Sequence, residues 1–90
     1  MRLLYSEEAV ENLRRFDPVE RQLIAKKLRY LAENFEALKQ TKKVKELKST
    51  RYPDQYRYII ARKIRAIFKV DGDKLELLVL RVGRRKNVHE

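Results

Sequence analysis

The arginines of the carboxy-terminal half are the residues whose type and spacing point most directly to chemistry. They lie on or beside apolar segments typical of strands, at Arg57, Arg65, Arg81, Arg84 and Arg85. A guanidinium group binds phosphate through a planar fork of N–H donors, and several that converge on one phosphate stabilise the extra charge of a pentavalent transition state. Such a set would suit phosphodiester cleavage without a metal ion.

Other catalytic patterns are missing from the sequence. It has no cysteine and one histidine, His89, so a thiolate nucleophile, a disulfide framework and a paired-histidine metal site are excluded. A glycine-rich phosphate loop is also absent, since the chain has two glycines. We therefore expect neither a metal nor another cofactor.

The excess positive charge is concentrated in the middle of the chain. The net charge is +10, and residues 37–69 carry eleven basic and two acidic side chains, whereas residues 1–36 carry seven of each. A solvated lysine-rich loop would explain residues 39–48 alone, but the excess continues into a predicted strand pair. This distribution favours a polyanion or an acidic protein as the partner.

Two helices are predicted in the amino-terminal half. RLLY at 2–5 predicts a short strand, and Ser6 is a favourable N-cap for a helix directly after it. DPVE at 17–20 supplies an N-cap, a proline at the first helical position and a capping-box glutamate. The second helix carries an apolar stripe from Leu23 to Phe35, so we expect it to pack on a flat surface and to end near Phe35 or Leu38.

The period of the apolar pattern changes from 3.6 to 2 after residue 55. Strands are predicted at 56–61, 63–70 and 74–82, with a hairpin turn at 71–73 in which Gly72 takes a positive φ. The unbroken LLVL of the last strand indicates a central position, covered on both sides. Residues 44–47 are expected to form a short turn or a strand entry.

These elements predict one α+β domain over residues 1–90, in the order β-α-α-β-β-β, with a helical hairpin on one face of a small antiparallel-rich sheet. The arginines would occupy the opposite face. No apolar stretch reaches membrane-spanning length, so we expect no membrane partner and a cytoplasmic protein.

Several motifs resemble the RelE toxins of the RelE/ParE superfamily, small proteins encoded with acidic antitoxins. The similarity covers essentially the whole chain and is strongest in LKSTRYPDQYR at 47–57, the strand pair running from YR to IRAIF, the acidic turn DGDK, and LLVLRVGRRKNVHE at 77–90. The last motif is the most specific, because an apolar strand running into V-G-x-R and a short tail is characteristic of the group.

The resemblance implies a ribosome-dependent endoribonuclease that cleaves mRNA without metal, using the 2′-hydroxyl of the RNA as the nucleophile. The motif positions imply that Arg65 and Arg85 hold the scissile phosphate and that Arg57 orients the nucleophile or holds a flanking phosphate. His89 stands where the family has a tyrosine and would act as a base or an acid. Further candidates for binding RNA phosphate are Arg81, Arg84, Lys48, Arg51 and Lys63.

The same resemblance leaves other functions open. A ParE-like inhibitor of DNA gyrase is the main alternative, and a catalytically degenerate toxin that binds antitoxin or RNA is another. Each predicts a small acidic antitoxin as a partner, with the toxin a monomer within the complex, whereas the ribonuclease also requires ribosome and mRNA. Cleavage requires Arg65 and Arg85 to share one side of the sheet, without carboxylate partners.

Overall fold

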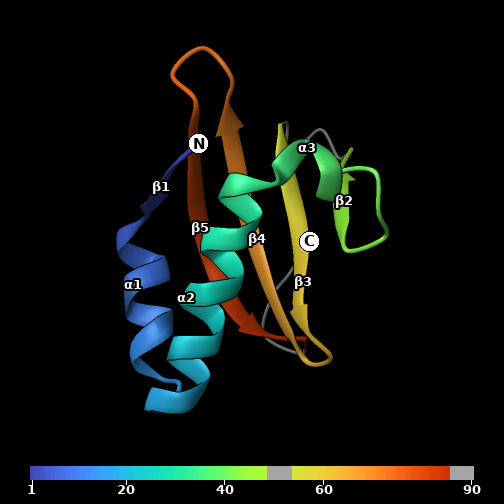
Figure 1. Ribbon diagram of the computed structural model, residues 1–90. Coiled ribbons are helices and arrows are strands. Elements are labelled where there is room, and N and C mark those ends of the chain that lie inside the picture. The colour runs from blue at the N-terminus through green and yellow to red at the C-terminus, as the bar shows by residue number, and fades with distance from the viewer. Residues whose placement is uncertain (49–53, 86–90) are drawn as a thin grey trace.

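The computed structural model describes residues 1–48 and 54–85, in which helices cover one side of a five-stranded sheet (Figure 1). This is the α+β class that the sequence predicts. The elements in chain order are β1 (Arg2–Tyr5), α1 (Glu7–Arg14), α2 (Pro18–Glu33), α3 (Phe35–Leu38), β2 (Val44–Leu47), β3 (Gln55–Ala61), β4 (Ile64–Asp71) and β5 (Glu76–Arg84).

Both predicted helix starts are confirmed by their caps. The Ser6 hydroxyl oxygen accepts a hydrogen bond from the backbone N–H of Ala9 at 3.0 Å, and Asp17 Oδ1 accepts one from the N–H of Glu20 at 2.8 Å. Pro18 occupies the start of α2, where its missing N–H costs nothing because that group has no helical partner. These local signals therefore fix where α1 and α2 begin.

The second helix ends earlier than predicted, because Asn34 interrupts it. The backbone of Asn34 leaves the helical region, with φ −129° and ψ 28°, and the short helix α3 follows. The side-chain amide of Asn34 donates to the carbonyl of Tyr30 at 2.9 Å and so satisfies one carbonyl at the end of α2. The buried apolar face of α2 is also narrower than the sequence predicts, since Leu23, which was assigned to that face, is 39% exposed.

The sheet has the strand order β1-β5-β4-β3-β2. β1 pairs with β5 in parallel, and the remaining neighbours are antiparallel. The segment expected to be a turn or strand entry is the edge strand β2, in which Val44 lies opposite Tyr58. The predicted three-stranded meander is β3-β4-β5, and it lies between β1 and β2 in the sheet.

The turn between β4 and β5 differs from the prediction. No glycine among the described residues has a positive φ, and Leu75 takes the left-handed conformation instead, with φ 54°. Asp71 Oδ1 accepts hydrogen bonds from the N–H groups of Asp73 and Lys74, each at 3.1 Å. The side chain of Asp71 thus closes the turn, and Gly72 keeps an ordinary backbone.

Strand β5 lies between β1 and β4, as a central strand should. Complete coverage on both sides was nevertheless a wrong prediction. Leu77 and Val79 are fully buried, whereas Leu78 and Leu80, which alternate with them, are only half-buried. The helices therefore cover one face of this strand, and the other face is partly open to water.

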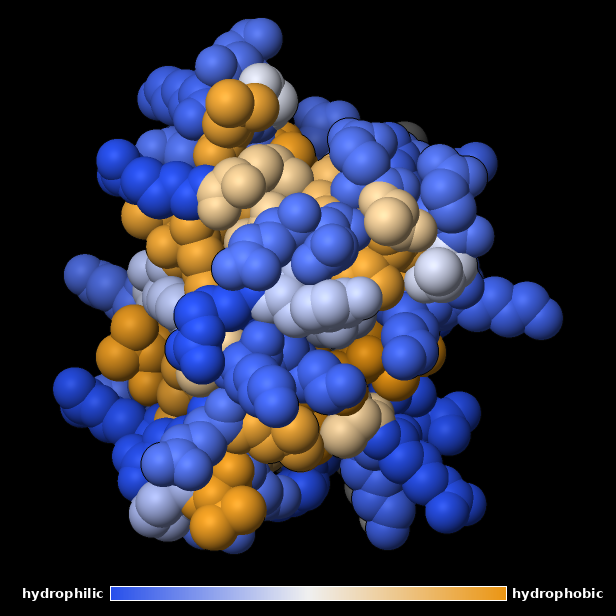
Figure 2. Space-filling model, in the orientation of Figure 1, coloured by the Kyte–Doolittle hydropathy of each residue, from blue (hydrophilic) through white to orange (hydrophobic). Residues whose placement is uncertain are grey.

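The core lies between the helices and the sheet. It contains Phe68, Leu77 and Val79 from the strands and Ile24 and Leu28 from α2, all without solvent exposure. Burial of each such side chain stabilises the fold by about 1.5–3 kcal/mol. The outer helical side is largely hydrophilic with separate hydrophobic patches (Figure 2). No helix within residues 1–48 and 54–85 is long and apolar enough to cross a membrane.

Candidate nucleic-acid interface

One row of the sheet brings two of the predicted arginines to the face that the helices do not cover. Arg57 of β3 and Arg81 of β5 both lie opposite Ile67 of β4. Ala66 and Phe68 belong to the core under the helices, so alternation along the strand directs Ile67 and its partners to the other face. Ile67 has no solvent exposure, and it separates two half-buried arginines.

Arg65 lies in the next row, opposite Ile59 of β3 and Gly83 of β5. Its Nη1 atom donates to the carbonyls of Ala61 and Arg62, each at 3.3 Å. These carbonyls belong to the end of β3 and the turn that follows. The guanidinium group of Arg65 is therefore held at this end of the sheet, and its remaining N–H donors stay available for a phosphate.

Arg85 directly follows β5, and its backbone continues the ladder with β4. The N–H of Arg85 donates to the carbonyl of Lys63 at 2.8 Å. Alternation from Gly83 then places Arg85 on the same face as Arg65. Neither arginine forms an ion pair with a carboxylate within the described part of the chain.

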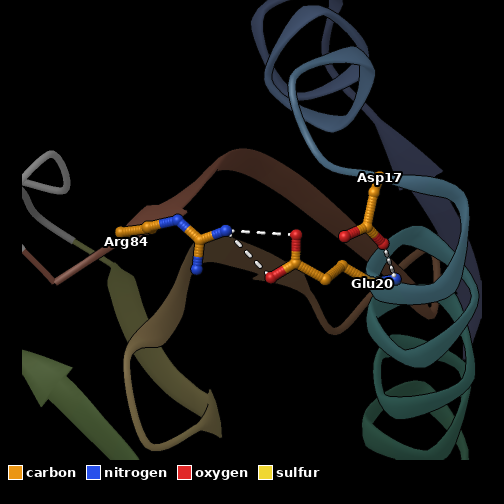
Figure 3. Close-up of polar contacts among 3 residues, drawn as sticks. All are labelled: Asp17, Glu20 and Arg84. Carbon is orange, nitrogen blue, oxygen red and sulfur yellow. Dashed lines mark hydrogen bonds and ion pairs between the residues drawn. The ribbon is translucent and has the colours of Figure 1, made fainter.

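Arg84 lies on the helical side instead. Its Nη2 atom contacts both carboxylate oxygens of Glu20, at 3.1 and 2.8 Å, from the end of β5 to the first turn of α2 (Figure 3). The guanidinium carbon also lies 5.2 Å from the ring centroid of Phe16. The structure therefore separates Arg84 from the open-face arginines with which the sequence analysis grouped it.

The remaining candidates are dispersed. Lys63 is exposed at the turn between β3 and β4, and Lys48 is exposed just after β2. Arg51 and His89 lie outside the described residues. The sequence analysis missed Lys45, which lies opposite Arg57 and extends the row of basic residues onto β2. The signal was weak, because residues 44–47 were not predicted to be a full strand.

Among the residues that the structure describes, two tyrosines on the helical side have a pKa shifted from its ordinary value. Burial raises the pKa of Tyr58, and the nearby Tyr30 raises it further. Burial also raises the pKa of Tyr5, while the positive charge of Arg29 acts in the opposite direction. Among the residues described, no group of histidine and carboxylate side chains could hold a metal ion. The candidate site is therefore built from cations and backbone carbonyls.

Solved structures that share this arrangement of helices and strands include a toxin–antitoxin complex and an isolated toxin. The RelBE2 complex of Mycobacterium tuberculosis matches with a TM-score of 0.77 and 14% identity, covering 93% of this chain and 96% of that one. The isolated RelE toxin of E. coli gives 0.71 and 22%, covering 98% and 87%. The YoeB dimer of Staphylococcus aureus gives 0.70 and 20%, covering 100% and 98%. The chain thus has the fold of a RelE-like toxin.

The family follows from the sequence comparison. A family model described as the ParE toxin of the type II toxin–antitoxin system, parDE, matches residues 3–89. No curated protein matches the chain. The chain belongs to the ParE toxin family and is the toxin of a type II toxin–antitoxin system, within the RelE/ParE superfamily that the sequence motifs indicated.

Proposed function

We propose that this toxin is a metal-independent endoribonuclease that cleaves mRNA on the ribosome and so inhibits translation in the cytoplasm. The observation that carries the proposal is the placement of Arg65 and Arg85 on one face of the sheet, without a carboxylate partner among the described residues. Two guanidinium groups at neighbouring ladder positions supply a planar, doubly charged site for one phosphodiester.

The reaction needs a nucleophile, charge stabilisation and two proton transfers. The 2′-oxygen of the RNA attacks the adjacent phosphorus, and the bond from phosphorus to the 5′-oxygen of the next nucleotide breaks. Arg65 and Arg85 stabilise the negative charge that develops on the phosphoryl oxygens. A base takes the proton of the 2′-hydroxyl, and an acid returns one to the leaving 5′-oxygen; His89 is the candidate for proton transfer.

Binding of the substrate uses the rest of the basic face. Arg57 and Arg81 flank Ile67 in the row next to Arg65, and Lys45 continues that row onto β2. A strand of RNA laid along this face would meet cations from four strands. The same charge suits a small acidic antitoxin that binds one copy of the toxin, and association should slow as the salt concentration rises.

The proposal is tested by mapping RNA 5′ ends on translated messages after induced expression. With the wild-type toxin, the cuts should recur at one fixed position within codons. These cuts should disappear in Arg65→Ala and Arg85→Ala. They should persist in Arg21→Ala, which removes an exposed arginine from α2. In a purified translation reaction, a message with a single 2′-deoxynucleotide at the cut site should survive, because it lacks the nucleophile. Cleavage at that site would contradict the mechanism.

Inhibition of DNA gyrase is the second candidate, and the match to the ParE family model favours it. In that case the toxin should arrest growth while mRNA remains intact. Plasmid supercoiling should change, and purified gyrase should lose activity in the presence of the toxin. Intact RNA together with unchanged supercoiling would exclude both activities and leave a toxin homologue that only binds.

A further inference from the structure

An open cavity lies between the end of β5 and the turn that joins β3 to β4, and the described residues that line it are all basic. Its volume is about 440 Å³, and its lining consists of Arg62, Lys63, Arg84 and Arg85. A water molecule occupies about 30 Å³ in the liquid, so the cavity has room for a phosphate group with several waters. The position is distinct from the row of Arg57 and Arg81 in the middle of the sheet.

Backbone contacts connect the residues around this cavity to Arg65, which does not itself line it. The N–H of Arg85 donates to the carbonyl of Lys63 at 2.8 Å and fastens the end of β5 to the turn. Nη1 of Arg65 donates to the carbonyls of Ala61 and Arg62 in the same turn. The turn at residues 61–63 therefore binds the side chain of Arg65 and the backbone of Arg85, and it also supplies two of the residues that line the cavity.

The charge inside the cavity is not balanced by the described part of the chain. Arg84 pairs with Glu20 at 2.8 Å, so the charge of that lining residue is already balanced. Arg62, Lys63 and Arg85 are exposed and make no ion pair with a carboxylate among residues 1–48 and 54–85. Three like charges around one cavity repel each other, and an anion placed between them relieves that repulsion.

We propose that this cavity binds a second phosphate of the RNA strand, next to the scissile phosphate. The inference rests on the proposed function, since Arg65 and Arg85 define the scissile position. Arg85 would reach both phosphates, while Arg62 and Lys63 would contact the second one alone. The cavity would therefore set how far the bound strand must extend beyond the cut, and it would contribute to binding more than to the chemical step.

The test measures binding of a single-stranded RNA that carries a 2′-deoxynucleotide at the cut site and therefore stays intact. Arg62→Gln/Lys63→Gln should weaken binding roughly tenfold at low salt, because two charge-assisted contacts to one phosphate are lost. A plot of log affinity against log salt concentration should become shallower by about 0.7 for that phosphate. The matched control, Arg21→Gln/Lys26→Gln, removes an exposed arginine and an exposed lysine from α2 and should leave the slope unchanged.

Two further arms separate the possible results. Inorganic phosphate at constant ionic strength should not displace the RNA. The inference is wrong if phosphate binds the wild type but not the double variant while the salt slopes of RNA binding are equal for the two proteins. In that case the cavity is a site for free phosphate. Equal slopes for the double variant and its control also refute it. A thermal unfolding scan checks that the double variant is folded.

Cleavage kinetics with ribosome-bound mRNA as the substrate distinguish the failure of this inference from the failure of the proposed function. The double variant should lose rate mainly at low RNA concentration, whereas Arg65→Ala should lose rate at saturating RNA. If no form cleaves RNA but the salt slope still changes, the second phosphate site stands and the nuclease proposal fails. If the wild type cleaves and the slopes stay equal, the nuclease stands and the site fails.

Discussion

The ion pair between Glu20 and Arg84 should stabilise the fold by a small, measurable and salt-dependent amount. The pair joins α2 to the end of β5 at 2.8 Å, and the side chains are 28% and 48% exposed. Partial exposure limits such a pair to about 0.5–1 kcal/mol. Contact with the ring of Phe16 at 5.2 Å adds about 0.5 kcal/mol for a partly exposed cation–π interaction. Glu20→Gln should therefore cost about 0.5–1 kcal/mol, and Arg84→Gln about 1–1.5 kcal/mol.

The assay is a double-mutant cycle by urea unfolding, with both single variants and the double variant. The coupling free energy should be about 0.5–1 kcal/mol at low salt and should fall in 1 M salt, where the Debye length is about 3 Å. Glu11 and Arg14 provide the control, because their pair is also close, at 2.9 Å, but is 61% and 68% exposed. Its coupling should be about 0.3 kcal/mol.

Thermal unfolding gives an independent measure, since 1 kcal/mol corresponds to about 4–8 °C in Tm for a domain of this size. A coupling of zero between Glu20 and Arg84 would refute the reasoning, as would a coupling that 1 M salt leaves unchanged. A coupling equal to that of the control pair would show that the link between α2 and β5 has no more effect than a pair within one helix.

Three other changes test separate parts of the fold. Asn12→Ala removes the acceptor that lies 2.9 Å from the N–H of Val82 and should cost about 1–3 kcal/mol in urea unfolding, whereas Asn12→Asp should cost less because it keeps an acceptor. Leu75→Gly should raise the free energy of unfolding by up to about 1 kcal/mol, since φ is 54° there and leucine is strained at that angle; a loss of stability would contradict this. Burial raises the pKa of Tyr58 in the folded state above its usual 10.0, so an unfolded tyrosine ionises first and stability should fall as the pH rises from 10 through the raised value. Tyr58→Phe should show a shallower fall in alkaline urea titrations.

The parts of the fold that local sequence controls were predictable. The caps at Ser6 and Asp17 depend on residues three positions away, so both helix starts could be predicted. Strand β2 depends on the pairing of Val44 with Tyr58, and four residues with two apolar positions carry too weak a pattern to show it. The left-handed residue of the last turn was also misplaced, because the Asp71 side chain rather than Gly72 closes that turn.

The candidate site was likewise predictable only in part. The resemblance singled out Arg65 and Arg85 and required them to share a face, but the predicted strand ended at residue 82, so strand alternation in the sequence could not place Arg85. The partner of Arg84 was not predictable, since Glu20 is 64 residues away in the chain and no local pattern links them. The cavity at the turn between β3 and β4 likewise depends on how the end of β5 meets that turn.

The parallel pairing of β1 with β5 determines when the sheet can be completed during synthesis. Leu3 and Leu4 pair with Leu77 and Leu78, and the Ser6 hydroxyl donates to a carbonyl 74 positions later. A nascent chain that has not yet reached β5 leaves β1 without its neighbour, and contacts this distant in sequence form slowly. The ladder that carries Arg65 opposite Gly83 is incomplete until the same moment. A chain synthesised only as far as β4 therefore has Arg57 and Arg65 but lacks Arg81, and the basic face is assembled only once β5 has been made.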